Sequence, residues 1–309
     1  MRILFTGASS FTGYWFVKTL AAQGHEVVCP VTGSLERYEG VRRRRVEQLL
    51  KQCQFIPGAP FGSDAFLRLA RGEQWDLLCH HAAEMANYRS PQFDALEALG
   101  KNTLNLPAVL GALQERGLKA VVLTGSVFEN DEGIGNEPLR AFSPYGLSKG
   151  LTSQVFRHYC GQGRISLFKF VIPNPFGPFE EERFTAYLMR HWREEKAPTV
   201  KTPAYIRDNI HADLLALAYA KCVDRAANAK HSFRKVNPSG YVESQGAFAL
   251  RVAREVKART GWACEVDLAR QEDFSEPLMR VNHEPAAQVF PGWNECAAWD
   301  AFVEFYRGA

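Results

Sequence analysis

A tyrosine and a lysine stand four residues apart in the segment SPYGLSKG, at Tyr145 and Lys149. In a helix this spacing puts both side chains on one face. An ammonium group beside a phenol stabilises the phenolate and lowers the pKa of the tyrosine from about 10 toward neutral pH. The pair could therefore serve as a general acid/base, although the same spacing also occurs on ordinary solvated helix faces.

Short apolar segments alternate with longer amphipathic ones in the first half of the chain. RILFTG, HEVVCPV, WDLLCHHAA and KAVVLTGS are typical of strands, and residues 14–23 and 104–116 are typical of helices. Strands separated by helices predict a parallel sheet covered on both faces, which is a doubly wound α/β domain. Ligands bind beyond the carboxyl ends of such strands. The segments at those ends are 6–13, 31–34, 81–84 and 124–128.

The composition is that of an ordinary soluble globular protein. The 309 residues are 46% hydrophobic, enough for a large core, and the net charge of +3 is too small to indicate nucleic-acid binding. Seven cysteines without a Cys-x-x-Cys pair predict neither a disulfide framework nor a zinc site, and they favour a reducing cytosol. Because MRILFTG reads as a buried strand and no apolar run reaches membrane-spanning length, we expect no signal peptide and no membrane segment.

The turn TGASSFTG follows the first predicted strand and contains Gly7 and Gly13 just before a helix. Backbone N–H groups and the helix dipole at that point could hold a pyrophosphate. Ser10 stands where the dinucleotide-binding fingerprint has its middle glycine. A tight strand-to-helix turn is the alternative, but the preceding strand favours the binding interpretation.

The order of six motifs resembles the extended short-chain dehydrogenase/reductase family, in its branch of nucleotide-sugar epimerases, dehydratases and ketoreductases. The motifs are Gly7-x-x-Ser10-x-x-Gly13, DLLCHHAA, LTGSVFEND, Tyr145-x-x-x-Lys149, VIPNPFGP and RDNIHADLLA, and they cover nearly the whole chain. The resemblance implies that Tyr145 is the catalytic acid/base and that Lys149 holds it near its phenolate form and binds the nicotinamide ribose. It also implies that Thr124 polarises the substrate oxygen, a role that Ser126 could share. Simple turn formation at the strand end is the alternative for both hydroxyls.

The resemblance and the strand pattern together predict a Rossmann-type α/β fold with a smaller, interleaved C-terminal substrate lobe. Beyond residue 172 the alternation of strands and helices breaks, and prolines become frequent. We expect residues 1–172 to form the dinucleotide-binding domain, with 206–225 returning to it. Residues 173–205 and 226–309 are expected to form the substrate-binding lobe.

The residues after the strand at 120–123 bear on the type of reaction. Dehydratases of the family carry Thr-Asp-Glu there, whereas this chain has Thr124, Gly125 and Ser126, so the acid and base of a dehydration are missing. A 4-ketoreductase, which we favour, and a 4-epimerase remain open. A non-catalytic NAD(P)-binding protein is a third alternative, against which the intact Thr124, Tyr145 and Lys149 argue.

The segment after the second predicted strand bears on the cofactor. No carboxylate follows Val31 to bind the 2′-hydroxyl of NAD. Thr32, Ser34 and Arg37, with Arg42 close behind, could instead accept the 2′-phosphate of NADP. We therefore expect NAD or NADP, with NADP favoured. Leu99, where the family commonly packs an asparagine beneath the cofactor, also indicates looser binding, and this favours a reductase that releases its cofactor.

The remaining site residues follow from their places in the motifs. The expected cofactor contacts are Gly7, Ser9, Ser10, Phe11, Thr12, Gly13, Thr32, Ser34, Arg37, His81, Ala82, Ala83, Tyr145 and Lys149. The expected substrate contacts are Glu84, Ser126, Asn174, Phe176, Arg207 and Arg280, with Arg270 as an alternative to Arg280. His80 and His81 have no third ligand at metal spacing, so no metal site is expected. The expected partner is a nucleotide sugar, bound by a cytoplasmic homodimer that contacts neither nucleic acid nor a membrane.

Overall fold

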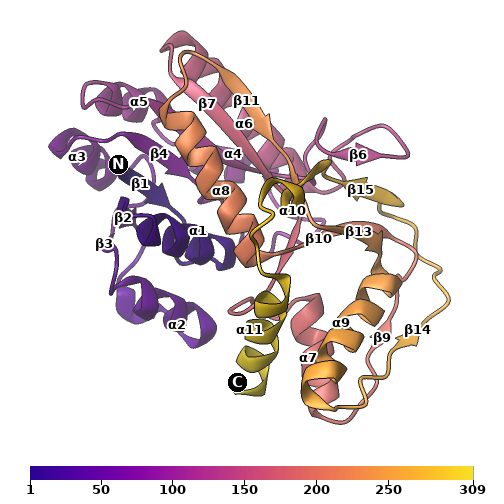
Figure 1. Cartoon of the computed structure of the whole chain (residues 1–309). Coiled ribbons are helices and arrows are strands. Elements are labelled where there is room, and N and C mark those ends of the chain that lie inside the picture. The colour runs from indigo at the N-terminus through magenta and orange to yellow at the C-terminus, as the bar shows by residue number, and fades with distance from the viewer. Residues whose placement is uncertain (309) are drawn as a thin grey trace. The chain divides into compact units, whose positions relative to one another are not determined.

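The computed structural model describes residues 1–308, which divide into two compact units (Figure 1). The first unit consists of Met1–Glu132, Arg140–Ile172 and Ala216–Asn237. The second consists of Gly133–Leu139, Pro173–Leu215 and residues 238–308. The segment that returns to the first unit thus lies later than the predicted 206–225, because residues 206–211 form a strand of the second unit.

A parallel sheet of seven strands forms the first unit, in the order β11-β7-β5-β4-β1-β2-β3. Every neighbouring pair in it is parallel. The strands are β1 (Arg2–Thr6), β2 (Glu26–Pro30), β3 (Gln54–Ile56), β4 (Leu77–His80), β5 (Ala120–Ser126), β7 (Ser166–Ile172) and β11 (Phe233–Val236). The chain runs outward from β1 in one direction to β3 and in the other to β11. The strand order therefore reverses between β1 and β4, where doubly wound sheets bind their ligands.

Helices cover both faces of this sheet, which confirms the predicted doubly wound α/β fold. They are α1 (Phe11–Ala22), α2 (Gly40–Leu49), α3 (Asp64–Gly72), α4 (Ala95–Asn102), α5 (Leu106–Gln114), α6 (Pro144–Gln162) and α8 (Ala212–Ala227). On one face, side chains of α3, α5 and α6 form a buried apolar cluster with β1, β4 and β5. On the other, the rings of Phe16 from α1 and Tyr219 from α8 stack with centroids 4.0 Å apart.

The second unit has a smaller sheet in the order β13-β10-β15-β6, with β8 also paired to β10. Its strands are β6 (Ile134–Gly135), β8 (Asn174–Phe176), β10 (Ile206–His211), β13 (Tyr241–Ser244) and β15 (Met279–Val281). Two short pairs complete it, β9 (Thr199–Val200) with β14 (Asp267–Leu268) and β12 (Pro238–Ser239) with β16 (Glu284–Pro285). The helices are α7 (Phe184–Arg193), α9 (Gln245–Thr260), α10 (Ala286–Val289) and α11 (Glu295–Arg307). Side chains of α7, α9 and α11 form its apolar core.

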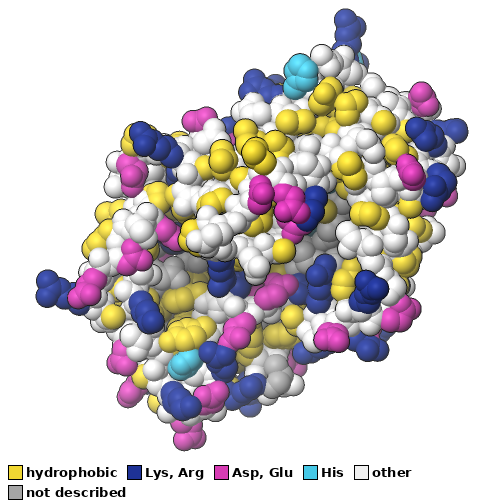
Figure 2. Space-filling model, turned by 180° about the vertical axis from the view of Figure 1, so that it is seen from behind, with side chains coloured by type: hydrophobic (Ala, Val, Ile, Leu, Met, Phe, Trp, Pro, Cys, Tyr) yellow, Lys and Arg dark blue, Asp and Glu magenta, His cyan; other side chains and the backbone are white. Residues whose placement is uncertain are grey.

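Side chains of both charge signs are interspersed on the face seen in Figure 2. This mixture agrees with the small net charge of +3. All seven cysteines are free thiols, and Cys296 is the exposed one. Among residues 1–308, none of the helices combines the length and the apolar character needed to cross a bilayer.

Candidate functional site

The loop between β1 and α1 requires glycine at two positions. Gly7 has a φ of 82°, and a Cβ on it would lie 2.8 Å from the backbone nitrogen of Ala82. A Cβ on Gly13 would lie 2.2 Å from the carbonyl oxygen of Gly7. The loop is thus closed tightly against the residues that follow β4. This shape presents the N-terminus of α1 in the way that pyrophosphate-binding loops require.

Ser10 caps α1 from inside this loop. Its Oγ accepts a hydrogen bond from the Gly13 N–H at 3.1 Å and donates to the Gly7 carbonyl at 2.8 Å. The serine that replaces the middle glycine of the fingerprint therefore holds the loop together.

Tyr145 and Lys149 lie one turn apart at the start of α6. Ser143 caps the helix, accepting from the Gly146 N–H at 3.0 Å, and Pro144 opens it. The ring of Tyr145 packs edge-on against that of Tyr88, with centroids 5.3 Å apart. The spacing in the sequence thus produces the shared helix face that the acid/base hypothesis needs.

The ammonium of Lys149 ties α6 to the end of β5. Its Nζ donates to the carbonyl oxygen of Thr124 at 2.5 Å, and the residue is only 4% exposed. Burial lowers the pKa of Lys149 to about 8, with nearby Glu129 raising it and Lys169 lowering it. A lysine whose charge changes so close to neutral pH is typical of a functional site.

A buried ion cluster accompanies Lys149. Lys169 on β7 pairs with Glu129 at 2.5 Å and with Glu132 at 2.6 Å, and all three side chains are at most 4% exposed. Glu129 also accepts from the Ser126 N–H at 2.7 Å, which fixes the turn after β5. The sequence analysis missed this cluster. The sequence feature that could have revealed the cluster is the single lysine inside the apolar strand SLFKFVI, because a buried lysine requires a carboxylate partner.

Thr124 and Ser126 have different surroundings. The Thr124 Oγ1 lies 2.9 Å from the Nδ1 of His81, and the residue is 4% exposed. The Ser126 Oγ accepts from the Phe128 N–H at 3.2 Å, as expected for a serine that stabilises a turn. Thr124 is therefore the more buried of the two hydroxyls, and Ser126 is partly exposed.

Arg42, and not Arg37, reaches the glycine-rich loop. The Nε and Nη2 of Arg42 donate to the Ser9 Oγ at 3.1 and 2.8 Å, and its guanidinium lies 4.8 Å from the centre of the Tyr38 ring. Arg37 is exposed in the short 3-10 helix η1 (Leu35–Arg37). In the sequence analysis Arg42 was only a secondary candidate, behind Arg37.

The segment after β2 also contains a carboxylate that the sequence analysis did not consider. Glu36 is exposed, and hydrogen bonds from its own backbone and from the Ser34 side chain lower the pKa of its carboxyl. Ser34 is thereby engaged, and Thr32 is exposed. Of the predicted 2′-phosphate ligands, Ser34 and Arg37 are therefore less well placed than the Arg42 guanidinium.

Glu84, predicted to contact substrate, closes its own loop after β4. Its Oε1 accepts from the next two backbone N–H groups, and its Oε2 pairs with Lys101 at 2.9 Å. The buried Asn102 accepts from the Glu84 N–H at 2.8 Å and donates to the Thr152 Oγ1 at 3.3 Å. Leu99 lacks the side-chain amide that the family commonly has beneath the cofactor. Asn102, one turn later in α4, supplies a buried amide instead.

The predicted substrate-binding arginines lie side by side in the second unit. Arg207 on β10 and Arg280 on β15 are partners in register, and both are buried. Arg207 donates to Glu276 at 2.7 Å and to the Pro277 carbonyl at 3.0 Å. Arg270, the alternative to Arg280, is exposed and lies outside these strands.

Asn174 on β8 is the register partner of Asn209 on β10. The Nδ2 atoms of both are buried and have no hydrogen-bond partner among the described residues. Phe176, which was expected to contact the substrate, instead packs in the core of the second unit against Phe248 and Trp299. Asn209 was not among the predicted site residues, because only the pairing of β8 with β10 places it beside Asn174.

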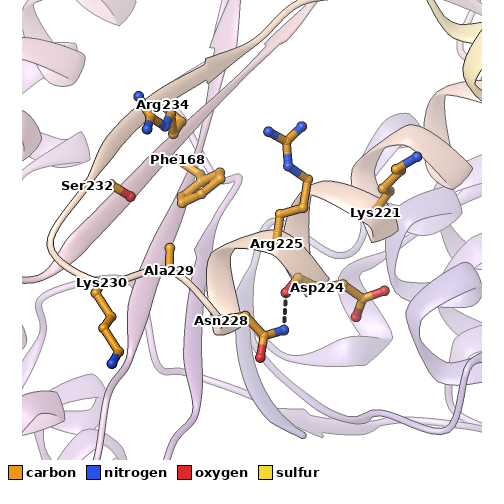
Figure 3. Close-up of a pocket in the computed structure, with 9 residues that line it drawn as sticks. All are labelled: Phe168, Lys221, Asp224, Arg225, Asn228, Ala229, Lys230, Ser232 and Arg234. Atoms are coloured by element: carbon orange, nitrogen blue, oxygen red, sulfur yellow. Dashed lines mark hydrogen bonds between the residues drawn. The ribbon is translucent and has the colours of Figure 1, made fainter.

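A hollow of about 650 Å³ in the first unit contains none of the predicted site residues (Figure 3). It lies beside α8, β7 and β11. It is lined by Phe168, Lys221, Asp224, Arg225, Asn228, Ala229, Lys230, Ser232 and Arg234. Among residues 1–308, no three His, Cys, Asp or Glu side chains are grouped closely enough to hold a metal ion.

Solved structures share this fold over the whole chain. UDP-glucose-4-epimerase from Stenotrophomonas maltophila, with bound NAD and formylated UDP-arabinopyranose, is 18% identical, with a TM-score of 0.77 and coverage of 100% of this chain and 98% of its own. UDP-glucuronic acid 4-epimerase from Bacillus cereus, in complex with UDP-glucuronic acid and NAD, is 16% identical, with a TM-score of 0.77 and coverage of 100% and 99%. The dTDP-glucose 4,6-dehydratase from Streptomyces venezuelae is 18% identical, with a TM-score of 0.73 and coverage of 100% and 97%.

The family itself is shown by the sequence. No curated protein matches the chain. The profile of the NAD dependent epimerase/dehydratase family, however, matches residues 3–237, which include the glycine-rich loop, Thr124, Tyr145 and Lys149. The chain therefore belongs to the NAD dependent epimerase/dehydratase family, and it is an enzyme of the extended short-chain dehydrogenase/reductase type that its motifs indicated.

Proposed function

We propose that the protein transfers a hydride between a nicotinamide cofactor and C4 of a nucleotide-diphosphate sugar, acting as a 4-ketoreductase. The observation that carries the proposal is the buried ammonium of Lys149, held at 2.5 Å by the Thr124 carbonyl with Tyr145 one turn away. The three groups belong to one unit. They supply the proton donor, its supporting cation and a hydroxyl for the reacting oxygen.

The proposed reaction assigns one step to each group. The nicotinamide, when bound, supplies the hydride for the C4 carbonyl carbon. Tyr145 gives its phenolic proton to the carbonyl oxygen as negative charge develops there. The Lys149 ammonium stabilises the phenolate that remains, and Thr124 contacts the same C4 oxygen. The glycine-rich loop, with Gly7, Ser9, Ser10, Phe11, Thr12 and Gly13, and the His81–Ala83 segment would hold the cofactor.

The substrate class rests on the second unit. Paired cations and amides suit the charged oxygens of a diphosphate and the hydroxyls of a sugar. Arg207 and Arg280 would bind the diphosphate, for which Arg207 would exchange its Glu276 partner, and Asn174 would bind the diphosphate or the sugar. The ligands named in the structural relatives, formylated UDP-arabinopyranose and UDP-glucuronic acid, support this class.

Arg42 is the residue that we expect to bind the 2′-phosphate of NADP. We expect Arg42→Ala to raise the Kd of NADPH about 10- to 100-fold and to leave that of NADH unchanged, because a charge-assisted contact is worth about 1–3 kcal/mol. Arg37→Ala is the matched control, and it should change neither the Kd of NADPH nor that of NADH. Fluorescence titration of both cofactors measures the effect. Equal affinities of the wild-type protein for NADH and NADPH would refute a 2′-phosphate site.

A 4-epimerase is the second candidate, because the structural relatives include three nucleotide-sugar 4-epimerases with NAD. An epimerase retains its cofactor through an oxidation and a reduction, and it would use the same tyrosine, lysine and threonine. Tighter binding of NADH than of NADPH would favour it.

One experiment separates the two reactions. A 4-ketoreductase should oxidise one NADPH for each 4-keto-6-deoxy sugar nucleotide that it reduces, seen as loss of nicotinamide absorbance together with product by mass spectrometry and NMR. UDP-, dTDP-, GDP- and CDP-sugars would be tested in parallel. Interconversion of gluco and galacto epimers without added cofactor would overturn the ketoreductase. Cofactor binding with no turnover of any sugar would support a non-catalytic protein.

A further inference from the structure

Two buried ammonium groups meet two buried carboxylates at the end of β5. Lys149 from α6 and Lys169 from β7 are 4% and 3% exposed, and Glu129 and Glu132, from the turn that follows β5, are 0% and 1% exposed. Lys169 contacts both carboxylates, at 2.5 and 2.6 Å. These four side chains, the buried charge set, carry two positive and two negative charges and are balanced when all are ionised.

Glu129 and Lys149 bind to the same edge of β5. The Lys149 Nζ donates to the carbonyl oxygen of Thr124 at 2.5 Å. The Glu129 Oε1 accepts from the N–H of Ser126 at 2.7 Å. Successive peptide groups of a strand point to opposite edges, so the carbonyl of one residue and the N–H of the second residue after it point the same way. The carboxylate and the ammonium are therefore bound to adjacent peptide groups on one side of the strand.

Glycines on both sides of Lys149 allow the turn after β5 to approach α6. A Cβ on Gly146 would lie 2.2 Å from the carbonyl oxygen of Phe128. A Cβ on Gly150 would lie 3.9 Å from the Cβ of Glu129. Glu129 is thus held against the turn of α6 that carries the ammonium.

Lys169 lies against β5 at Gly125 and holds Glu129 from the other side. A Cβ on Gly125 would lie 2.7 Å from the Lys169 Cε and 3.1 Å from the Glu129 Oε1. The glycine therefore leaves the space that this ion pair fills. Glu132 has a second partner in Lys235, at 2.8 Å, whose side chain is 38% exposed, so the charge of Glu132 is also compensated from the surface.

The remaining titratable groups near α6 are neutral or paired at the surface. Burial lowers the pKa of His80 and of His81 to about 3, so both are neutral at working pH. On α4, the exposed Lys101 pairs with Glu97 at 2.8 Å and with Glu84 at 2.9 Å. Helix α5 has no charged side chain. The charge around the ammonium of α6 is therefore set by the buried charge set.

We propose that Glu129 is a positioning residue for the reaction, whose buried carboxylate is the counter-charge that keeps Lys149 an ammonium beside Tyr145. The role rests on the proposed C4 chemistry and refines it, because the ammonium stabilises the phenolate that remains when Tyr145 has given up its proton. Burial lowers the pKa of Lys149 to about 8, Glu129 raises it and Lys169 lowers it. Without the carboxylate, a buried ammonium loses its proton at lower pH, and a neutral amine no longer supports the phenolate.

The charge of Lys149 is measured without turnover. In protein labelled with ¹³C at the lysine Cε, the Lys149 signal should titrate near pH 8 in the wild type. Glu129→Gln keeps the size of the side chain and an oxygen for the Ser126 N–H, and it should lower this pKa by about 1 unit or more, the usual effect of a nearby charge. Lys149→Met identifies the signal. An unchanged pKa in a folded Glu129→Gln protein would overturn the proposal.

A double-mutant cycle separates charge from structure. Lys169→Met removes the opposing positive charge and should raise the pKa of Lys149. Adding Glu129→Gln to it removes one charge of each sign and should return the pKa to within about 0.5 unit of the wild-type value. If Glu129 only held the turn in place, the double variant would not recover. The comparison with Lys169→Met also measures the effect of Glu129 if the single Glu129→Gln variant does not fold.

Glu97→Gln is the matched control. It removes an exposed carboxylate from α4, which packs against α6, and it should leave the titration of Lys149 unchanged, because water screens the lost charge. Circular dichroism and thermal unfolding verify that each variant is folded.

The pH profile connects the charge of Lys149 to turnover. In Glu129→Gln the alkaline limb of kcat should move to lower pH by the same amount as the Lys149 titration, and in the double variant it should move back. A shifted titration with an unshifted profile of an active enzyme would show that Glu129 does not act on the reaction. Conversely, the expected titrations in a protein that reduces no 4-keto sugar nucleotide would reject the proposed function and leave Glu129 as the counter-charge of Lys149.

Discussion

Tyr145→Phe is expected to lower kcat by about 10²- to 10⁴-fold, the usual contribution of a positioned general acid. The substitution removes the transferable proton and leaves the ring, which packs against Tyr88 and Phe93. Cofactor affinity and the unfolding temperature should stay near those of the wild-type protein. Turnover with a 4-keto sugar nucleotide, cofactor titration and thermal unfolding measure the three quantities.

Tyr88→Phe is the matched control for this prediction. Tyr88 presents the same kind of ring to the same site, and its hydroxyl only accepts from Arg89 at 3.1 Å. It should retain nearly full activity. If the Tyr145→Phe protein is folded and remains nearly as active as the control, the acid lies elsewhere.

Gly13→Ala should abolish tight cofactor binding. The new Cβ would lie 2.2 Å from the carbonyl oxygen of Gly7 and 2.7 Å from the Ser10 Oγ, so backbone atoms of the loop must move. Because the obstacle is backbone, we expect a loss of about 2–4 kcal/mol in the free energy of unfolding and an increase of at least about 100-fold in the Kd of the cofactor. Chemical denaturation and fluorescence titration measure the two effects.

Gly111→Ala serves as the control for the glycine substitution. Gly111 lies inside α5, and a Cβ there would have no atom within 4 Å. Alanine is the better helix former by about 1 kcal/mol, so this variant should be at least as stable as wild type and should bind cofactor normally. Normal cofactor binding by Gly13→Ala would show that the loop does not have to keep this shape.

The parts of the fold that the sequence predicted are those with a local signal. The parallel strands are buried on both faces, so they appear as continuous apolar runs such as AVVL in β5. The shared helix face of Tyr145 and Lys149 was also predictable, because their spacing of four residues is that of one helical turn. The glycine-rich loop was recognisable because Gly7 and Gly13 are required by backbone geometry within seven residues of chain.

The parts that the sequence did not predict depend on how separate segments pack. Whether Arg37 or Arg42 reaches Ser9 is decided by the place of α2 beside the loop, which no residue of either segment reveals by itself. The partners of Lys169 come from the turn after β5, some forty positions earlier in the chain. Phe176 appeared to be a loop residue, because the proline-rich motif around it gave no sign that the aromatic side chains of α9 and α11 would enclose it.

The interleaving of the two units has a consequence for biosynthesis. β11 (Phe233–Val236) forms the last strand of the large sheet and pairs with β7, which is made some sixty residues earlier. Until the ribosome has released the chain beyond residue 237, β7 remains an open edge with unpaired backbone groups, and such edges recruit other extended chains. The first unit therefore cannot be completed before residue 237 has been made, and the second needs residues from the remainder of the chain. Until then the exposed edge of β7 is a point at which the unfinished sheet can associate with other chains.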